Sequence, residues 1–265
     1  MRIALLLTGC INPNGMSFTQ LINVDERKEQ YIHAIHYYLK ETDCQVVFCE
    51  NSNTDISPLL HTIENKQRFE ILTYPGNNDK QKGKGFGEAE IVEYALHYSS
   101  VLANSEIVVK ITGRLIINNI RSIVKSLTSK KDFVTCLFHS DLSFADSRIF
   151  CGTKAFYQAF LDNKNKINDS QGVFFEHILC STILDSPIPY IPFSEEPLIS
   201  GISGSTGETY IVQSPNAHRK LLYKHYSLVQ LLKIAKVAKF WHISTFHHII
   251  ISSRIAIYKL LLTII

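Results

Sequence analysis

The sequence lacks the short motifs that define several large enzyme classes. It contains no H-E-x-x-H, no G-x-S-x-G and no G-x-x-x-x-G-K-[ST], so it carries no signature of a zinc protease, an α/β-type serine hydrolase or a P-loop protein. The six cysteines form no C-x-x-C and several lie in apolar runs, which predicts buried thiols in a reducing compartment. The eleven histidines form no cluster at the spacing of a zinc site.

Acidic residues are absent from the last part of the chain. Residues 209–265 contain none of the 24 Asp and Glu residues but eight of the 27 Lys and Arg residues, so residues 1–208 have an acidic excess. We therefore divide the chain into a globular body over 1–208 and a basic helical tail over 209–265. An acidic body disfavours nucleic acid as the partner.

The tail combines aliphatic residues with lysines at three-residue spacing, namely Lys233, Lys236 and Lys239. Such a segment is typical of an interfacial helix on an anionic membrane surface, and packing against the body or a second subunit is the alternative. Residues 249–265 are too short and too charged to predict a membrane-spanning helix. At the N-terminus, a short apolar run is followed by Asn-Pro-Asn-Gly, which indicates a first strand rather than a signal peptide.

Composition and the order of segments predict the fold class. The 265 residues are 45% apolar and 19% charged, which fits a globular protein with one large α/β domain. Strand-like and helix-like segments alternate, and this pattern indicates a mostly parallel sheet flanked by helices on both faces. We expect strands over 3–9, 44–53, 69–76, 105–114, 132–138 and 148–153, and helices over 24–42, 87–102, 119–129, 154–161 and 172–184.

Polar residues follow three of the predicted apolar strands, at Thr8-Gly9, Glu50-Asn51-Ser52 and Thr112-Gly113-Arg114. In open α/β sheets the ligand binds at the carboxyl ends of the strands. Because side chains alternate across a strand, Lys110, Thr112 and Arg114 share one face. Two cations and a hydroxyl there would suit a diphosphate. The alternative is an ion pair of Lys110 with a carboxylate, with Arg114 at the exit of the strand.

A glycine-rich segment, Lys82-Gly-Lys-Gly-Phe-Gly-Glu88, leads directly into a predicted helix. Glycines let a backbone approach a ligand closely, and a helix N-terminus favours anions. Glu88 shares the inner face of this helix and needs a partner such as a ribose hydroxyl or a basic group. A flexible surface loop is the alternative for the glycines. The small, polar run over 200–207 predicts a mobile loop, either a lid over a phosphate or a linker.

The helix predicted over 172–184 carries a candidate general base. Glu176 lies beside aromatic residues on this helix, and a half-buried carboxylate can accept a proton from an attacking hydroxyl. His177 and Asp169 are the alternative bases. A solvated Glu176–His177 pair without a catalytic function also fits this segment.

The order of these segments resembles that of a bacterial glycosyltransferase of the GT-A type, of the sort found in capsule and O-antigen gene clusters. The resemblance covers about residues 1–208, from the strand ending Thr8-Gly9 to the helix GVFFEHIL, with the tail outside it. It implies a GT-A-like (Rossmann-like) nucleotide-sugar domain with its functional residues in four groups. These are Thr8, Gly9, Glu50 and Asn51 around the nucleoside; Lys84, Gly85, Gly87 and Glu88 near the ribose and phosphates; Lys110, Thr112 and Arg114 on the diphosphate; and Glu176 as the base, with Arg148 and Gly152 on the acceptor side.

In that family, the strand before the diphosphate usually ends in a D-x-D motif that holds a divalent metal. Thr112-Gly113-Arg114 stands in its place here. This departure from the family's pattern suggests that no cofactor is required and that Lys110 and Arg114 supply the positive charge, with a divalent metal as the alternative.

Together with these features, the resemblance implies a glycosyltransferase, a hexosyltransferase with a nucleotide-sugar donor for which a UDP-sugar is favoured. An inverting reaction is expected from the place of Glu176, with a retaining reaction as the alternative. The expected acceptor is a hydroxyl of a growing, lipid-linked surface polysaccharide or lipopolysaccharide. The tail would then hold the protein in the cytoplasm, on the inner face of the cell membrane. Two alternatives are a sugar nucleotidyltransferase and a non-catalytic nucleotide-binding or scaffold member of a polysaccharide assembly complex.

Overall fold

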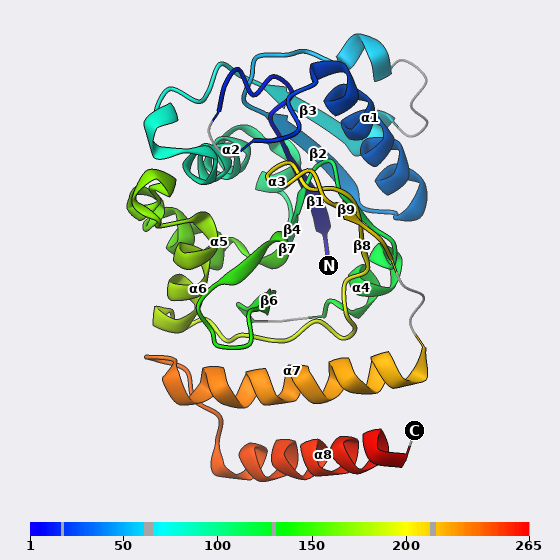
Figure 1. The fold of residues 1–265 in the computed structure, drawn as a ribbon, viewed down its shortest axis with the longest axis vertical. Helices are drawn as coiled ribbons and strands as arrows, with labels where there is room; N and C mark the ends of the chain where they lie inside the picture. The colour runs from blue at the N-terminus through cyan, green and yellow to red at the C-terminus, as the bar shows by residue number, and fades with distance from the viewer. Residues whose placement is uncertain (17–18, 61–65, 129–130, 213–215, 265) are drawn as a thin grey trace.

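The protein is built on one central sheet that is covered by helices on both faces (Figure 1). The computed structural model describes residues 1–16, 19–60, 66–128, 131–212 and 216–264. The sheet has six strands in the order β3-β2-β1-β4-β7-β6, of which β3, β2, β1 and β4 are parallel and β7 is antiparallel to both of its neighbours. The strands are β1 (Ile3–Gly9), β2 (Gln45–Glu50), β3 (Phe69–Thr73), β4 (Ile107–Thr112), β6 (Val134–Phe138) and β7 (Ala145–Thr153).

Each face of the sheet has its own apolar core. On one face, α1 (Val24–Glu41) and α4 (Ile120–Ser126) contribute buried residues such as Tyr38 and Ile123. On the other, α2 (Lys84–Tyr98), α5 (Lys154–Leu161) and α6 (Phe175–Asp185) contribute residues such as Phe156. A sheet buried on both faces needs strands that are apolar in their interiors, which β1 and β2 are, and β4 is apolar there except for Lys110. The predicted fold class is confirmed.

The predicted elements differ from the structure in a few places. The helix expected over 87–102 is two helices, α2 and α3 (Ser100–Ala103), because Ser99 ends α2 and its side chain accepts a hydrogen bond from the Leu102 N–H. Short 3-10 turns also occur at Ser57–Leu60, Lys66–Arg68, Lys80–Lys82, Lys164–Lys166 and Asp169–Gln171. Residues 129, 213–215 and 265, which fall within predicted segments, lie outside the described residues.

The loop expected over 200–207 begins in a strand at 200–202, and residues 203–207 connect two strands of a second, three-stranded sheet. This sheet contains β5 (Ile116–Ile117), β8 (Ile199–Ile202) and β9 (Thr209–Tyr210) in the order β5-β8-β9. The connection between β8 and β9, residues 203–208, is closed by a hydrogen bond in which the Ser203 N–H donates to the Glu208 carbonyl at 2.8 Å. The segment is therefore a hairpin beside the main sheet rather than a linker.

Helix α7 (Ala217–Val237) packs on the body. Ile234 is fully buried in the core of one sheet face, and Arg219 forms a two-pronged ion pair with Glu196. The boundary predicted after residue 208 falls inside the β8–β9 hairpin, so that division is corrected: β9 and α7 belong structurally to the body. The two-residue strand β9 and a helix that carries both lysines and aliphatic residues, α7, give little periodic signal in the sequence. The domain boundary was therefore predicted from charge alone and was misplaced.

Helix α8 (Thr245–Ile264) is the outermost layer and runs beside α7 (Figure 1). It has no buried residue. Among the described residues, α8 is the helix that is long and apolar enough to cross a membrane by length and composition.

All six cysteines are free thiols, and five are buried. Burial raises the pKa of the Cys151 thiol to about 12 and that of Cys180 to about 11. These thiols are therefore protonated near neutral pH and unreactive.

The packing of α7 can be tested by truncating one buried and one exposed side chain of the same helix. Ile234→Ala should lower the free energy of unfolding by about 2–5 kcal/mol, because it leaves a cavity in the core. Leu222→Ala is the matched control, since Leu222 is 50% exposed and its loss should change little. Urea unfolding measures both. Equal, small effects would show that α7 is not part of the folded body.

Candidate functional site

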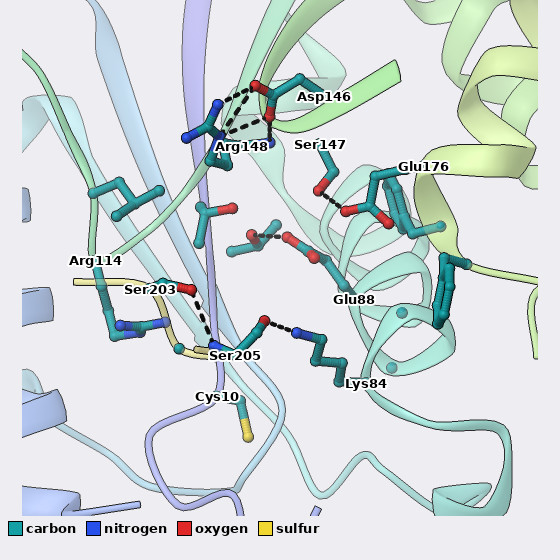
Figure 2. A pocket seen from close by; sticks show the side chains of 18 of the residues that line it. Cys10, Lys84, Glu88, Arg114, Asp146, Ser147, Arg148, Glu176, Ser203 and Ser205 are labelled. Carbon is teal, nitrogen blue, oxygen red and sulfur yellow. Dashed lines mark hydrogen bonds and ion pairs between the residues drawn. The ribbon is translucent and has the colours of Figure 1, made fainter. Parts of the chain in front are cut away.

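A cleft of about 870 Å³ opens at the carboxyl ends of β1, β2 and β4 (Figure 2). Helices α2 and α6 begin at its wall, and β7 begins there too because it runs antiparallel to β4. Most of the predicted site residues line this cleft: Thr8, Gly9, Asn51, Lys84, Gly85, Gly87, Glu88, Thr112, Arg114, Arg148 and Glu176. Glu50, Lys110 and Gly152 do not line it.

Lys110 lies beneath the cleft, fully buried, with its ammonium group surrounded by partners. It forms an ion pair with Glu88 and donates to the Ser147 carbonyl at 2.6 Å and to Thr112 Oγ1 at 3.3 Å. A buried cation needs such partners because water cannot solvate it. The predicted contact of Lys110 with a diphosphate is therefore corrected to an internal ion pair that joins β4, α2 and β7.

Glu88 is the member of this pair that faces the cleft. Its Oε1 also accepts a hydrogen bond from Thr8 Oγ1 at 3.0 Å. Burial raises the pKa of Glu88, but the positive charge of Lys110 and the hydrogen bonds from Lys110 and Thr8 outweigh burial, so the pKa lies below its ordinary value of 4.5. The cleft thus presents a carboxylate held in one position on its floor.

Glu50 has a structural function in the turn after β2. Its carboxylate is fully buried and accepts hydrogen bonds from the N–H groups of Ser52 and Thr54, both at 2.8 Å, and from the Thr73 hydroxyl. It shapes the strand end from which Asn51 reaches the cleft. The predicted contact of Glu50 with a nucleoside is corrected accordingly.

Gly152 lies near the amino ends of the parallel strands, at the end of the sheet opposite the cleft. It pairs with Val108 near the start of β4, because β7 runs antiparallel to β4. A Cβ on Gly152 would lie 2.9 Å from the Phe133 carbonyl oxygen, so close packing explains the glycine. Its predicted place on the acceptor side is wrong because the sequence pattern does not show the direction of β7.

The glycines before and within the start of α2 make room for protein side chains. A Cβ on Gly83 or Gly85 would lie 2.5 or 2.7 Å from atoms of Asp169, and one on Gly87 would lie 2.6 Å from Asn77 Oδ1. Asp169 Oδ2 accepts a hydrogen bond from the Gly85 N–H at 2.9 Å, so a carboxylate from a distant turn caps this helix. The first turn of α2 therefore already has an anionic partner, which the glycine pattern alone does not reveal.

Asp169 is a residue whose structural function the sequence analysis missed. It is 4% exposed, and its Oδ1 is buried without a hydrogen-bond partner. Burial raises its pKa, and the Gly85 N–H and the charge of Lys84 only partly oppose this. The signal for such a cap is indirect: Gly83, at the N-cap of α2, has no side chain, so another residue must supply the acceptor.

Two cations lie on the side of the cleft formed by the β8–β9 hairpin. Lys84 donates to the Ser205 hydroxyl (Figure 2). Arg114 donates to the Ile202 carbonyl and to Gln30 Oε1, both at 3.1 Å. Arg114 is 7% exposed, and its Nε is buried without a partner. Asn51 at the end of β2 likewise has a buried, unpaired Oδ1. Ten buried side-chain nitrogen and oxygen atoms of the described residues lack a hydrogen-bond partner, and these two lie at the strand ends.

The opposite side of the cleft contains Glu176 in the first turn of α6. Its Oε1 accepts a hydrogen bond from the Ser147 hydroxyl, and Figure 2 shows the two side chains facing each other. His177, the alternative base, accepts the Phe174 N–H on its Nδ1 at 3.1 Å and thereby caps α6. Glu176 is the freer of the two to accept a proton from a ligand.

Arg148 and Asp146 form a two-pronged ion pair at the start of β7, with contacts between 2.6 and 3.1 Å. The guanidinium also lies over the ring of Tyr210, 4.9 Å from its centroid. The lining residues that the sequence analysis did not select include Glu196 and five aromatic residues: Phe144, Phe174, Tyr210, Tyr223 and Tyr226. Tyr223 and Tyr226 come from α7, so the segment predicted as a separate tail forms part of the wall.

The described cleft residues are not arranged as a set of metal ligands. In the part of the chain that the structure describes, no three His, Cys, Asp or Glu side chains are grouped so that they could hold a metal ion. The end of β4 offers Thr112 and Arg114, a hydroxyl and a cation. These residues do not fit the divalent metal of the GT-A family.

No family model matches the chain, and no curated protein matches it. Among solved structures, it is similar to a protein described as a nucleotide-diphospho-sugar transferase from Desulfovibrio desulfuricans, with 11% identity over 72% of this chain and 80% of that one and a TM-score of 0.47. It is also similar to a glycosyltransferase involved in glycosylation of the major capsid of PBCV-1, with 9% identity over 72% of this chain and 82% of that one and a TM-score of 0.38. A third similar structure is a cytidylyltransferase from Leptospira borgpetersenii, with 13% identity over 92% of this chain and 99% of that one and a TM-score of 0.40. At these values the function has to be inferred from the cleft itself.

The Glu88–Lys110 pair should make the free energy of unfolding depend on pH in the acidic range. Because the folded-state pKa of Glu88 is below 4.5, its stabilising contribution is complete above that pH and is lost as the pH falls through the lower, folded value. We expect the wild type to lose free energy of unfolding more steeply than Glu88→Gln between about pH 5 and about pH 3. Urea unfolding at each pH measures this.

The control is Glu93→Gln, which removes a carboxylate paired with Lys164 but 47% exposed. Solvent screens such a pair, so the slope should change little. Parallel pH profiles for wild type and Glu88→Gln would contradict the buried pair.

Proposed function

We propose that this protein is a glycosyltransferase that uses a nucleotide-sugar donor. The observation that carries the proposal is the cleft at the strand ends, where two cations, Lys84 and Arg114, and the carboxylate of Glu88 line one space. A ligand that carries an anionic group and hydroxyl groups would be complementary to these charges. A nucleoside diphosphate linked to a sugar has both groups, and its size suits a cleft of about 870 Å³.

The charges suggest how such a donor would bind. Arg114 and Lys84 lie on one side of the cleft and would face the diphosphate, with Thr8, Gly9 and Asn51 around the nucleoside. Glu88 is an acceptor for a ribose or sugar hydroxyl. Lys110 acts through Glu88 as a positioning residue, since its own ammonium is already fully paired. We favour a UDP-sugar as the donor.

Transfer requires a base on the acceptor side, and we propose Glu176 for this function. An acceptor hydroxyl would attack the anomeric carbon and pass its proton to Glu176 as the bond from that carbon to the diphosphate oxygen breaks. The leaving diphosphate gains negative charge, which Arg114 and Lys84 would stabilise. Attack opposite the leaving group makes this an inverting hexosyl transfer. We further propose that no divalent metal is required, because fixed cations stand where a metal would act.

For the acceptor, we propose a lipid-linked surface glycan of the capsule or O-antigen kind in a bacterial cell. Arg148 and the aromatic residues near Glu176 would form its binding surface, since sugar rings pack on aromatic faces. A lipid-linked acceptor would bring the protein to the cytoplasmic face of the membrane, and the acid-free, basic tail supports such an association.

The first test concerns donor binding. Arg114→Gln should weaken binding of nucleoside diphosphates by about 1–3 kcal/mol, because a charge-assisted hydrogen bond to phosphate is lost. Calorimetric titration with UDP, GDP and CDP, with and without a chelator, measures the change. Arg121→Gln is the control, because Arg121 is 61% exposed and lies outside the cleft. Equal affinities in wild type and Arg114→Gln would remove Arg114 from the phosphate site. Binding that disappears in chelator would show that a metal is needed.

The second test concerns Glu176. Glu176→Gln keeps the size and much of the hydrogen bonding but removes the proton acceptor, so transfer should slow by about a hundredfold or more while donor affinity stays level. His177→Gln should affect transfer much less. Turnover of the donor found in the binding screen measures the rates, and product stereochemistry should be determined alongside. Near-normal transfer by Glu176→Gln would place the base elsewhere, and loss of donor binding would make Glu176 structural.

A further inference from the structure

Helix α8 carries an apolar stripe that faces away from the protein. Its members recur at helical spacing and therefore lie on one side of the helix, with Ser253 filling the gap. Each is 56–72% exposed: Phe246, Ile249, Ile257, Leu260 and Ile264. We call these five residues the outer stripe.

A different side of α8 packs against α7. The residues there are half-buried: Ile250, Ile251, Ile255, Tyr258 and Leu262. The helix is thus apolar on two sides, of which one is already used for packing. A contiguous exposed apolar surface on a folded protein indicates a contact with a partner or a membrane.

The charges around the outer stripe favour a lipid surface. Arg254 and Lys259 are exposed on opposite flanks of the stripe, and residues 209–265 contain no acidic side chain. An apolar stripe between cations is the pattern of a helix that inserts its apolar side among acyl chains while the cations contact anionic headgroups.

We propose that α8 alone is the membrane contact of this protein, and that it lies in the plane of an anionic bilayer with the outer stripe inserted. This differs from attachment through the whole tail, because α7 is part of the folded body. The proposal also differs from a spanning helix, although α8 has sufficient length for one.

Two observations argue against spanning. Arg254 lies at the middle of α8, where it would have to be placed at the centre of the bilayer at high cost. Moreover, α8 is packed along α7, which is tied to the body by the Arg219–Glu196 pair and by a 2.8 Å hydrogen bond from the Tyr226 hydroxyl to the Phe138 carbonyl. To cross the membrane, α8 would have to leave α7.

The arrangement links the membrane to the cleft. Helix α7 supports α8 on one side and contributes Tyr223 and Tyr226 to the cleft wall on another. With α8 in the membrane plane, α7 would hold the cleft at one height and orientation above the lipid. This last step rests on the proposed function, because a fixed height matters only if the acceptor is anchored in the same bilayer.

The experiment uses the full chain and vesicle flotation. Wild type should float with vesicles that contain phosphatidylglycerol, less with pure phosphatidylcholine, and less at high salt, because part of the attraction is electrostatic. The double variant Ile257→Asp/Leu260→Asp should bind anionic vesicles at least about tenfold more weakly, since two inserted side chains become charged. The control Thr245→Asp/Thr263→Asp adds the same charge off the stripe and should retain most of the binding.

Three outcomes would overturn the proposal. The first is equal flotation of both double variants, because the stripe would then not insert. The second is resistance of bound wild type to alkaline extraction, which would indicate a spanning helix. The third is no flotation together with a dimer that the stripe variant loses, which would make a second copy the partner. Nucleotide binding by the stripe variant is measured separately in solution, so failure here is distinguishable from failure of the proposed transferase activity.

Discussion

The buried ion pair between Lys110 and Glu88 is the interaction on which the cleft depends. One ammonium group joins the end of β4, the first turns of α2 and the start of β7, because it contacts Glu88 and the Ser147 carbonyl together. Ser147 in turn donates to Glu176. The end of β4 and the start of α6 are therefore linked through a single desolvated charge, and a buried charge tolerates little displacement of its partners.

A second constraint is the direction of β7. Because this strand runs antiparallel to β4, its first residues rather than its last reach the cleft, which brings Asp146, Ser147 and Arg148 opposite the ends of the parallel strands. For the same reason, Gly152 near the end of β7 lies at the end of the sheet opposite the cleft. An α/β sheet with one reversed strand thereby places charged residues from a strand start and a strand end in one cleft.

The helical layers outside the sheet divide into a packed and an unpacked part. Helix α7 is anchored by Ile234 in the core and by the ion pair of Arg219, and it contributes to the cleft wall. Helix α8 touches α7 and leaves its outer stripe exposed. The proposed donor site and the proposed base lie in the cleft, to whose wall α7 contributes, and the proposed lipid contact, α8, packs on α7.

The sequence by itself determined the sheet, most of its strands and the helices on its faces, because apolar runs and helical periodicity are local signals of burial. It also located most of the cleft, since the polar ends of parallel strands must meet at one edge. Only the tertiary structure decided which polar residues face the ligand space. Contacts between residues far apart in the chain decide whether Lys110 binds a diphosphate or pairs with Glu88. They also decide whether the glycines make room for a ligand or for Asp169, and where Gly152 lies. The physical reason is that the contacts of a buried charged group depend on which residues lie next to it in space, and a single sequence does not show which residues those are.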